Sequence, residues 1–325
     1  MAAAANLLLL LLGIAILYWG SAWLIRGSAR IARALGVKPL VVGLIVAAYS
    51  MSAPELAVST KTALTHHTPI ALGVVIGSCV ANISLILGLS ALIKPPTIDS
   101  RIIRRELPVL IGSAVVVPVF LRNKILSEAE GLALIGCAIL FTIVTLTVSA
   151  RFDPDDAYEA EARRAEDAAR TLGRSGSSSL VAIGMTLLGI GLLVIGSKLL
   201  VSGGRGIGTQ LGMSERMLGL TFISLGTALP ELIGSVVASV RGRSAVAIGS
   251  VIGSNLLNVF LVLGVTATLR PIRLGERMHL VDLIGLVAIT LLGALVLRGS
   301  RKISRIEGAI LVCAYIAFLV CAAIF

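Results

Sequence analysis

The sequence predicts an all-α membrane protein with ten transmembrane helices in two inverted-topology repeats of five. The 325 residues are 57% hydrophobic and 14% charged, with a mean hydropathy of +1.00, which leaves too little polar surface for a soluble domain. Apolar runs near the ~20 residues that cross a ~30 Å hydrocarbon core recur along the chain, without the short alternating segments of a membrane barrel. Finally, the second half of the chain repeats the pattern of the first half.

Charged residues, glycines and prolines divide the chain into ten candidate spans. These are residues 5–25, 39–64, 69–93, 107–121, 131–150, 180–203, 216–240, 245–269, 280–297 and 306–325. The first span has no Lys or Arg before its apolar run, and a similar segment recurs in mid-chain. We therefore interpret it as a transmembrane helix and not as a signal peptide.

Basic residues are distributed unevenly between the two sides of this arrangement. Connections 26–38, 94–106, 151–179, 241–244 and 298–305 hold 19 of the 28 Lys and Arg residues, and the connections on the other side hold seven. Cytoplasmic loops carry the excess of Lys and Arg, so both termini are predicted to lie outside a cell (inner) membrane. Topology therefore explains the net charge of +11 better than nucleic acid binding does.

The segment 151–179 is the one long polar connection, and it predicts a cytoplasmic linker between a first repeat, 1–150, and a second, 180–325. Its charges alternate in sign over a helix-like middle, and its end is rich in Gly and Ser. Asp153, Asp155 and Asp156 suggest a regulatory calcium site, but the Gly and terminal Glu of an EF-hand loop are missing. A solvated acidic stretch is the preferred interpretation.

Residues 20–95 align with residues 196–271 at a fixed offset of 176, without a gap, giving 25 identities in 76 positions. The matched pairs include Gly20/Gly196, Gly27/Gly203, Gly36/Gly212, Gly43/Gly219, Pro54/Pro230, Glu55/Glu231, Ser59/Ser235, Gly73/Gly249, Gly77/Gly253, Ser78/Ser254 and Asn82/Asn258. Five spans in each half is an odd number, so the second half enters the membrane with opposite orientation. Such inverted repeats belong mainly to secondary transporters.

The sharpest feature is a carboxylate that follows a proline in mid-membrane, in SMSAPELAVS at 50–59 and GTALPELIGS at 226–235. A charge at membrane depth costs from ~2.5 kcal/mol upward and is functional by default. The proline lacks an N–H, so it frees carbonyl oxygens and can split the helix. The pseudo-two-fold axis can bring Glu55 and Glu231 together, where a cation or protons must neutralise them. The alternative is a structural pair that is hydrogen-bonded across helices.

The next span of each half supplies further polar groups, in GVVIGSCVAN at 73–82 and GSVIGSNLLN at 249–258. Ser78 and Asn82, like Ser254 and Asn258, are four residues apart and share one helix face. Glycines four apart in the same segments allow close approach of a neighbouring helix. Small-residue packing alone would explain the glycines, but it explains the asparagines poorly.

Together these segments offer the oxygen ligands that a hard cation prefers, and Ca²⁺ takes 6–8 of them. Zinc or copper would prefer His or Cys. His66, His67 and His279 lie in loops or at loop edges, where we interpret His66 and His67 as solvated. Cys79, Cys137, Cys313 and Cys321 lie in apolar runs without metal-ligand spacing, which favours small hydrophobic packing over a zinc site or a disulfide.

At these residues the sequence resembles the calcium/cation antiporter superfamily, especially its prokaryotic sodium/calcium exchanger branch. That family has ten helices in two inverted halves, each with G-T-S-x-P-E followed by G-S-N/C-x-x-N/D. Here GLIVAAYSMSAPE and GSCVAN fill the first signature within 43–82, and GLTFISLGTALPE and GSNLLN fill the second within 219–258. The resemblance implies a shared Ca²⁺ and Na⁺ site whose ligands are Glu55, Glu231, Asn82, Asn258, Ser52, Thr227, Ser78 and Ser254.

Three departures from the family pattern involve four positions. Ser50 and Met51 replace Gly-Thr in the first signature, and Ala228 replaces Ser in the second, so two hydroxyls are lost. Asn258 stands where many exchangers of this branch have Asp. Two carboxylates carry about −2, which suits one Ca²⁺ or two protons better than three Na⁺. The counter-ion therefore stays open.

The leading hypothesis is an antiporter that exchanges Ca²⁺ for Na⁺ by alternating access, and the alternative is H⁺/Ca²⁺ exchange on the same glutamates. The implied partners are Ca²⁺, a monovalent counter-ion and the lipid bilayer, with no nucleic acid, protein partner or cofactor. An intramembrane hydrolase is disfavoured, since the sequence has no HExxH and no transmembrane His to activate a serine. A passive cation channel or sensor is the remaining class.

Overall fold

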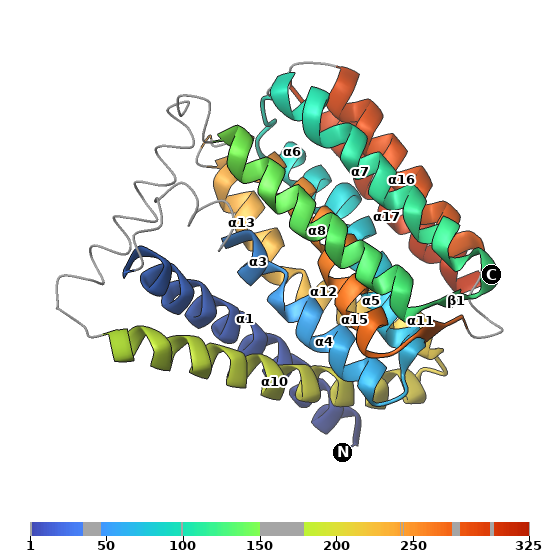
Figure 1. The fold of residues 1–325 in the computed structure, drawn as a ribbon. Helices are drawn as coiled ribbons and strands as arrows, with labels where there is room; N and C mark the ends of the chain where they lie inside the picture. Colours follow the sequence, from blue (N-terminus) through green and yellow to red (C-terminus); the bar gives the residue numbers. More distant parts are fainter. Residues whose placement is uncertain are drawn as a thin grey trace.

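The computed structural model describes residues 2–34, 47–98, 100–149, 179–240, 242, 244–274, 280–299 and 302–324, and these are almost wholly helical (Figure 1). The first half contains α1 (Ala2–Ala34), α3 (Ala47–Met51), α4 (Ala53–Leu64), α5 (Thr68–Val80), η2 (Ala81–Ile86), α6 (Leu87–Ile93), α7 (Ser100–Phe120), η3 (Leu121–Asn123), β1 (Ile125–Leu126) and α8 (Glu128–Ser149). The second half contains α10 (Ser179–Gln210), α11 (Glu215–Leu218), η4 (Gly219–Ile223), α12 (Ser224–Thr227), α13 (Leu229–Val240), α14 (Ser244–Leu257), η5 (Asn258–Leu263), α15 (Gly264–Leu269), β2 (Ile272–Arg273), α16 (Leu280–Gly299) and α17 (Arg305–Ile324).

The helices have the length and hydropathy of membrane spans. Eight helices among the described residues could each cross a membrane, and the bent pair 215–227 and 229–240 would make a ninth. The predicted span 39–64 lies partly outside the described residues, and α3 and α4 cover its remainder. The predicted linker also lies outside them, over 151–178. The prediction of an all-helical, multi-pass membrane protein is confirmed, and the described residues give eight or nine candidate spans.

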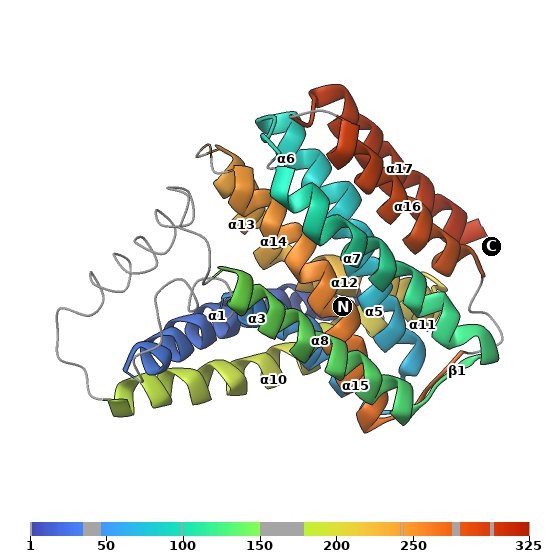
Figure 2. The same ribbon diagram turned by 45° about the horizontal axis from the view of Figure 1, so that its top comes forward.

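The long helices α1 and α10 lie side by side along one face of the molecule, in both Figure 1 and Figure 2. Their glycines pack against backbone of the partner helix, and the contacts run antiparallel. They pair Gly13 with Leu200, Gly20 with Leu193 and Gly27 with Thr186, and in the other direction Gly189 with Leu24, Gly196 with Leu17 and Gly203 with Leu10. Each contact in the first set has an equivalent in the second set when 176 is added to or subtracted from both residue numbers. The two helices therefore contribute equivalent residues to one close interface.

The centre of the molecule is formed by α5 and α14, most of whose side chains are buried. They meet at two residues that are themselves 176 positions apart. The amide Nδ2 of Asn255 donates to the carbonyl oxygen of Cys79 at 3.1 Å, and the Cys79 thiol donates to the carbonyl oxygen of Asn255 at 3.8 Å. The two partners therefore occupy equivalent positions of the sequence repeat and bond reciprocally.

Outer helices pack around this centre. On one side lie α7, α16 and α17, and α8 packs against η5 and α15. A buried ion pair joins Arg216 Nη1 of α11 to Asp282 Oδ1 of α16 at 3.0 Å, and Arg216 also donates to the carbonyl of Ala322 in α17. Two short antiparallel contacts complete the bundle, one between β1 and β2 and one between Thr97 and Lys302. The bent helix pair 215–227 and 229–240 is therefore anchored at its start, through Arg216, to α16 and α17.

The glycine interface between α1 and α10 predicts opposite outcomes for two neighbouring glycines. A Cβ at Gly189 would lie 2.6 Å from the backbone nitrogen of Leu24, whereas a Cβ at Gly191 has no neighbour within 4 Å in the described structure. Gly189→Ala is expected to cost about 1–3 kcal/mol of stability. Gly191→Ala is expected to gain up to about 1 kcal/mol from helix propensity. Thermal unfolding of the purified variants in detergent checks this, and equal midpoints would contradict the interface.

Candidate functional site

Each predicted carboxylate lies in the first turn of a half-helix that follows a break at membrane depth. The break before α4 falls at Ser52, with φ −79° and ψ 1°, and the break before α13 falls at Ala228, with φ −80° and ψ 2°. The second break bends the helix by 49°. Pro54 and Pro230 explain both breaks, because neither can donate the backbone hydrogen bond that would continue the preceding turn. The sequence prediction of a proline-split helix is thus confirmed in both halves.

The carboxylates of Glu55 and Glu231 are fully buried, and none of their oxygens has a hydrogen-bond partner among the described residues. The two side chains interact electrostatically. The hydroxyls of Ser78 and Thr227 lie beside the Glu55 carboxylate without completing hydrogen bonds that would satisfy it. Four predicted site residues from α4, α5, α12 and α13 therefore meet at one place.

The other predicted ligands are also buried, in elements that pack beside the two half-helices. Asn82 is the second residue of the π-helical segment η2, and Asn258 is the first residue of η5. The amide atoms of both asparagines and the hydroxyl of Ser52 have no hydrogen-bond partner in the described structure. The half-helix α4 packs against η5, and α13 packs against η2. Ser254 is 2% exposed in α14, four residues before Asn258.

This arrangement leaves buried polar atoms unsatisfied, which is costly unless a ligand pairs with them. A buried polar group without a hydrogen bond costs about 1–3 kcal/mol, and a buried charge costs more. The orphaned atoms near the two carboxylates are chiefly oxygens, which suits a hard cation such as Ca²⁺ or Na⁺. Their number and type therefore point to a cation as the missing partner.

Two departures from the family pattern have visible consequences. The methyl of Met51 lies against Gly234 of α13, in contact with the opposite half-helix. The carbonyl of Ser50, which Pro54 leaves without its usual helical donor, accepts a hydrogen bond from the Ser21 hydroxyl at 2.8 Å. This freed carbonyl is therefore bonded to α1.

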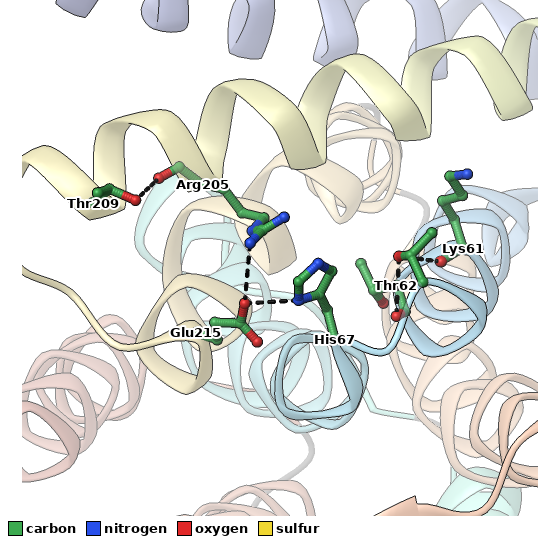
Figure 3. A network of polar contacts seen from close by, with 7 residues as sticks. Lys61, Thr62, His67, Arg205, Thr209 and Glu215 are labelled. Atoms are coloured by element: carbon green, nitrogen blue, oxygen red, sulfur yellow. Dashed lines mark hydrogen bonds and ion pairs between the residues drawn. The ribbon is translucent and has the colours of Figure 1, made fainter.

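His66 lies exposed in the turn after α4, as the sequence predicted, whereas His67 is only partly exposed. Figure 3 shows His67 pointing at Glu215, with Nδ1 2.8 Å from Oε1, while Arg205 of α10 approaches the same oxygen at 3.5 Å. His66 Nδ1 lies 2.7 Å from a guanidinium nitrogen of Arg270. Both imidazoles therefore join distant segments, and the His67 network links α10 to the helices that carry the site.

Sequence reasoning missed two features at the centre. It did not single out Asn255, whose amide bonds to Cys79 although its Oδ1 stays unpartnered. The repeat could have identified this pair, because position 255 is equivalent to position 79 at the offset of 176. It also missed the π-helical segments at 81–86, 219–223 and 258–263, which have no composition signature but recur at functional sites.

Comparison with known proteins agrees with this geometry. Residues 5–147 and 181–323 each match the sodium/calcium exchanger protein family, again at an offset of 176. The chain is 35% identical over 311 residues to a putative antiporter, CaxA, of Alkalimonas amylolytica, covering 95% of each chain. It is 30% identical over 343 residues to the sodium/calcium exchanger MaX1 of Methanosarcina acetivorans, covering 97% of each.

The fold matches a solved structure as well. The sodium-calcium exchanger NCX_Mj, soaked with Na⁺ and Sr²⁺, superposes with a TM-score of 0.66 and 28% sequence identity over 98% of both chains. A broken helix pair with buried, unpartnered carboxylates, a repeat matched twice and whole-chain likeness thus agree. The chain belongs to the sodium/calcium exchanger family of membrane antiporters.

Proposed function

We propose that this protein exchanges Ca²⁺ for Na⁺ across the membrane by alternating access. One observation carries the proposal: Glu55 and Glu231, from equivalent half-helices, are buried together with no hydrogen-bond partner for any carboxylate oxygen in the described structure. Two like charges in a low dielectric repel each other unless a cation or protons neutralise them. The family of the chain supplies the transport chemistry that such a site would serve.

The proposed architecture has ten spans in two inverted repeats, 1–150 and 180–325, joined by the linker 151–179. The antiparallel contacts of α1 with α10 recur at the offset of 176 and support this arrangement. So do the reciprocal bonds of Cys79 and Asn255 and the two family matches. The excess of basic residues in alternate connections supports a cell (inner) membrane location, with both termini outside and the linker in the cytoplasm.

In the proposed site, the carboxylates of Glu55 and Glu231 ligate one Ca²⁺ between the repeats. The remaining oxygen ligands come from side chains that flank the carboxylates, namely Asn82, Asn258, Ser52, Thr227, Ser78 and Ser254. The α1 and α10 pair rocks against the other helices, so the site faces each side of the membrane in turn. Its glycine interface keeps the two helices together as one moving body.

Proton/calcium exchange on the same two glutamates is the second candidate. It is favoured by the charge of the site, which is about −2 because Asn258 adds no third carboxylate. Two protons neutralise this charge after Ca²⁺ leaves. It is also favoured by the loss of hydroxyls at Met51 and Ala228, which leaves fewer ligands for Na⁺. In this version transport falls steeply at low pH, because protons compete with Ca²⁺ for the carboxylates.

The first prediction separates the two counter-ions. In liposomes that contain the purified protein, ⁴⁵Ca²⁺ uptake is expected to follow an imposed Na⁺ gradient and to continue when the pH gradient is collapsed. Protein-free liposomes give the background. Uptake that ignores Na⁺ and stops with the pH gradient would transfer the assignment to H⁺/Ca²⁺ exchange, and no uptake under either gradient would remove calcium as the substrate.

The second prediction concerns the carboxylates. Glu55→Gln and Glu231→Gln are each expected to lower Ca²⁺ uptake more than about tenfold. Each removes a charged group that binds the cation directly, and loss of a residue that only hydrogen-bonds to a metal ligand already lowers metal affinity or activity about tenfold. Glu128→Gln, at an exposed carboxylate in the first turn of α8, is the matched control and should keep wild-type uptake. Normal uptake in either buried variant would exclude this site.

The third prediction concerns stoichiometry. With two carboxylates, Ca²⁺ exchanges for two monovalent cations and moves little net charge, about zero per cycle. Asn258→Asp adds a carboxylate and is expected to give a Na⁺-dependent transport current on a solid-supported membrane. Asn258→Ser, which adds no charge, should give no such current. Equal currents in the wild type and both variants would contradict the link between site charge and stoichiometry.

A further inference from the structure

The two carboxylate-bearing half-helices end in the same way, at residues 176 positions apart. Beyond the end of α4, His66 has φ 65° and donates its backbone N–H to the carbonyl of Ala63 at 3.1 Å. Beyond the end of α13, Gly242 has φ 77° and donates to the carbonyl of Ser239 at 2.9 Å. Both ends are therefore left-handed caps, one at each end of the proposed transport path.

A basic residue from the opposite repeat contacts each of these ends. Lys94 Nζ donates to the carbonyl of Val240, the last residue of α13, at 3.2 Å. Arg270 contacts His66 at 2.7 Å, two residues beyond the end of α4. Lys94 and Arg270 are themselves 176 positions apart, and their backbone N–H groups bond equivalently, to the carbonyls of Ser90 and Thr266 at 3.0 Å. Equivalent basic residues therefore contact both ends, Lys94 through a backbone carbonyl and Arg270 through the His66 side chain.

Buried hydroxyls follow each carboxylate along its half-helix and its neighbouring helix. On α4, Ser59 and Thr62 follow Glu55 on one helix face, and the neighbouring α15 adds Thr266. On α13, Ser235 and Ser239 follow Glu231, and the neighbouring α6 adds Ser90. The hydroxyls of Ser90, Ser239 and Thr266 have no hydrogen-bond partner in the described structure. A polar line thus runs along each half-helix, away from the centre and towards its capped end.

We propose that Lys94 and Arg270 are charge gates at the two mouths of the cation path, a role that rests on the proposed exchange function. Lys94 docks on the last carbonyl of α13, where the partial negative charge of the helix end attracts a cation, and Arg270 docks on the imidazole of His66, the residue that caps α4. A transported cation competes with the docked side chain for that end and is repelled by its charge. Under the proposed orientation, Arg270 guards the outside and Lys94 guards the cytoplasmic side.

This role predicts effects on one side of the membrane only. A positive unit charge about 8 Å from a Ca²⁺ ion lowers the occupancy of Ca²⁺ at the mouth roughly two- to fivefold in a water-like dielectric. Arg270→Gln is therefore expected to lower the half-saturating Ca²⁺ concentration by that factor when Ca²⁺ is added outside, and Lys94→Gln when it is added to the cytoplasmic face. Salt near 1 M should reduce both effects, because it shortens the Debye length to about 3 Å.

The test uses right-side-out and everted membrane vesicles of an expression host, with empty-vector vesicles as background. Arg122→Gln and Arg104→Gln are the matched controls, since each removes an exposed charge near one mouth without altering a capped end. If wild-type vesicles do not exchange Ca²⁺, the proposed function fails. If they do, but each variant shifts both sides equally or neither side, the gate proposal alone is overturned.

A chemical test of charge distinguishes a gate from a structural contact. Arg270→Cys and Lys94→Cys are treated with methanethiosulfonates that attach either a trimethylammonium or a sulfonate group, and treated wild type controls for the native cysteines. The positive adduct should restore the wild-type half-saturating concentration, and the negative adduct should lower it below that of the untreated variant. Adducts of opposite charge with the same effect would overturn the proposal.

Discussion

The structure depends on one constraint: two carboxylates, Glu55 and Glu231, are held together in the centre of a membrane protein with no partner for their charge in the described structure. Such an arrangement persists only if something that binds there neutralises it. The polar atoms around it are orphaned in the same way, and they come from both halves of the chain. Under the proposed function, a bound cation neutralises the site, and transport requires that this cation leave and be replaced.

The sequence repeat explains how the chain brings two carboxylates and further buried polar groups together. Each half supplies a proline-broken helix that starts with a carboxylate and a second helix that turns π-helical at its asparagine. Cys79 and Asn255, at equivalent positions of the repeat, bond reciprocally where the halves meet, and the proposed ligands of the two halves would lie equivalently about one axis. The α1 and α10 pair is joined to the same helices through the Arg205, Glu215 and His67 network. A movement of that pair would act on this network directly.

The sequence was sufficient to predict an all-helical, multi-pass membrane protein and the burial of the two carboxylates. Hydropathy and the fixed offset of 176 predicted the helices and paired Glu55 with Glu231, because burial of a carboxylate and repetition are both visible in composition and spacing. It was insufficient where a residue's partner comes from far along the chain. The sequence does not show that Arg270 contacts His66 or that Glu215 contacts His67, and Ser21 donates to the Ser50 carbonyl only because α1 packs there. The π-helical segments, too, arise from packing and have no sequence signature.

The central claim is that both carboxylates bind one divalent cation together, and equilibrium binding of Ca²⁺ to the purified protein in detergent, measured by isothermal titration, tests it most directly. The account predicts about one Ca²⁺ per chain, and loss of that single site in either Glu55→Gln or Glu231→Gln, because each cation needs both charges. Two Ca²⁺ per chain, with one lost in each variant, would mean that the carboxylates bind separately. Undiminished binding in both variants would place the cation elsewhere.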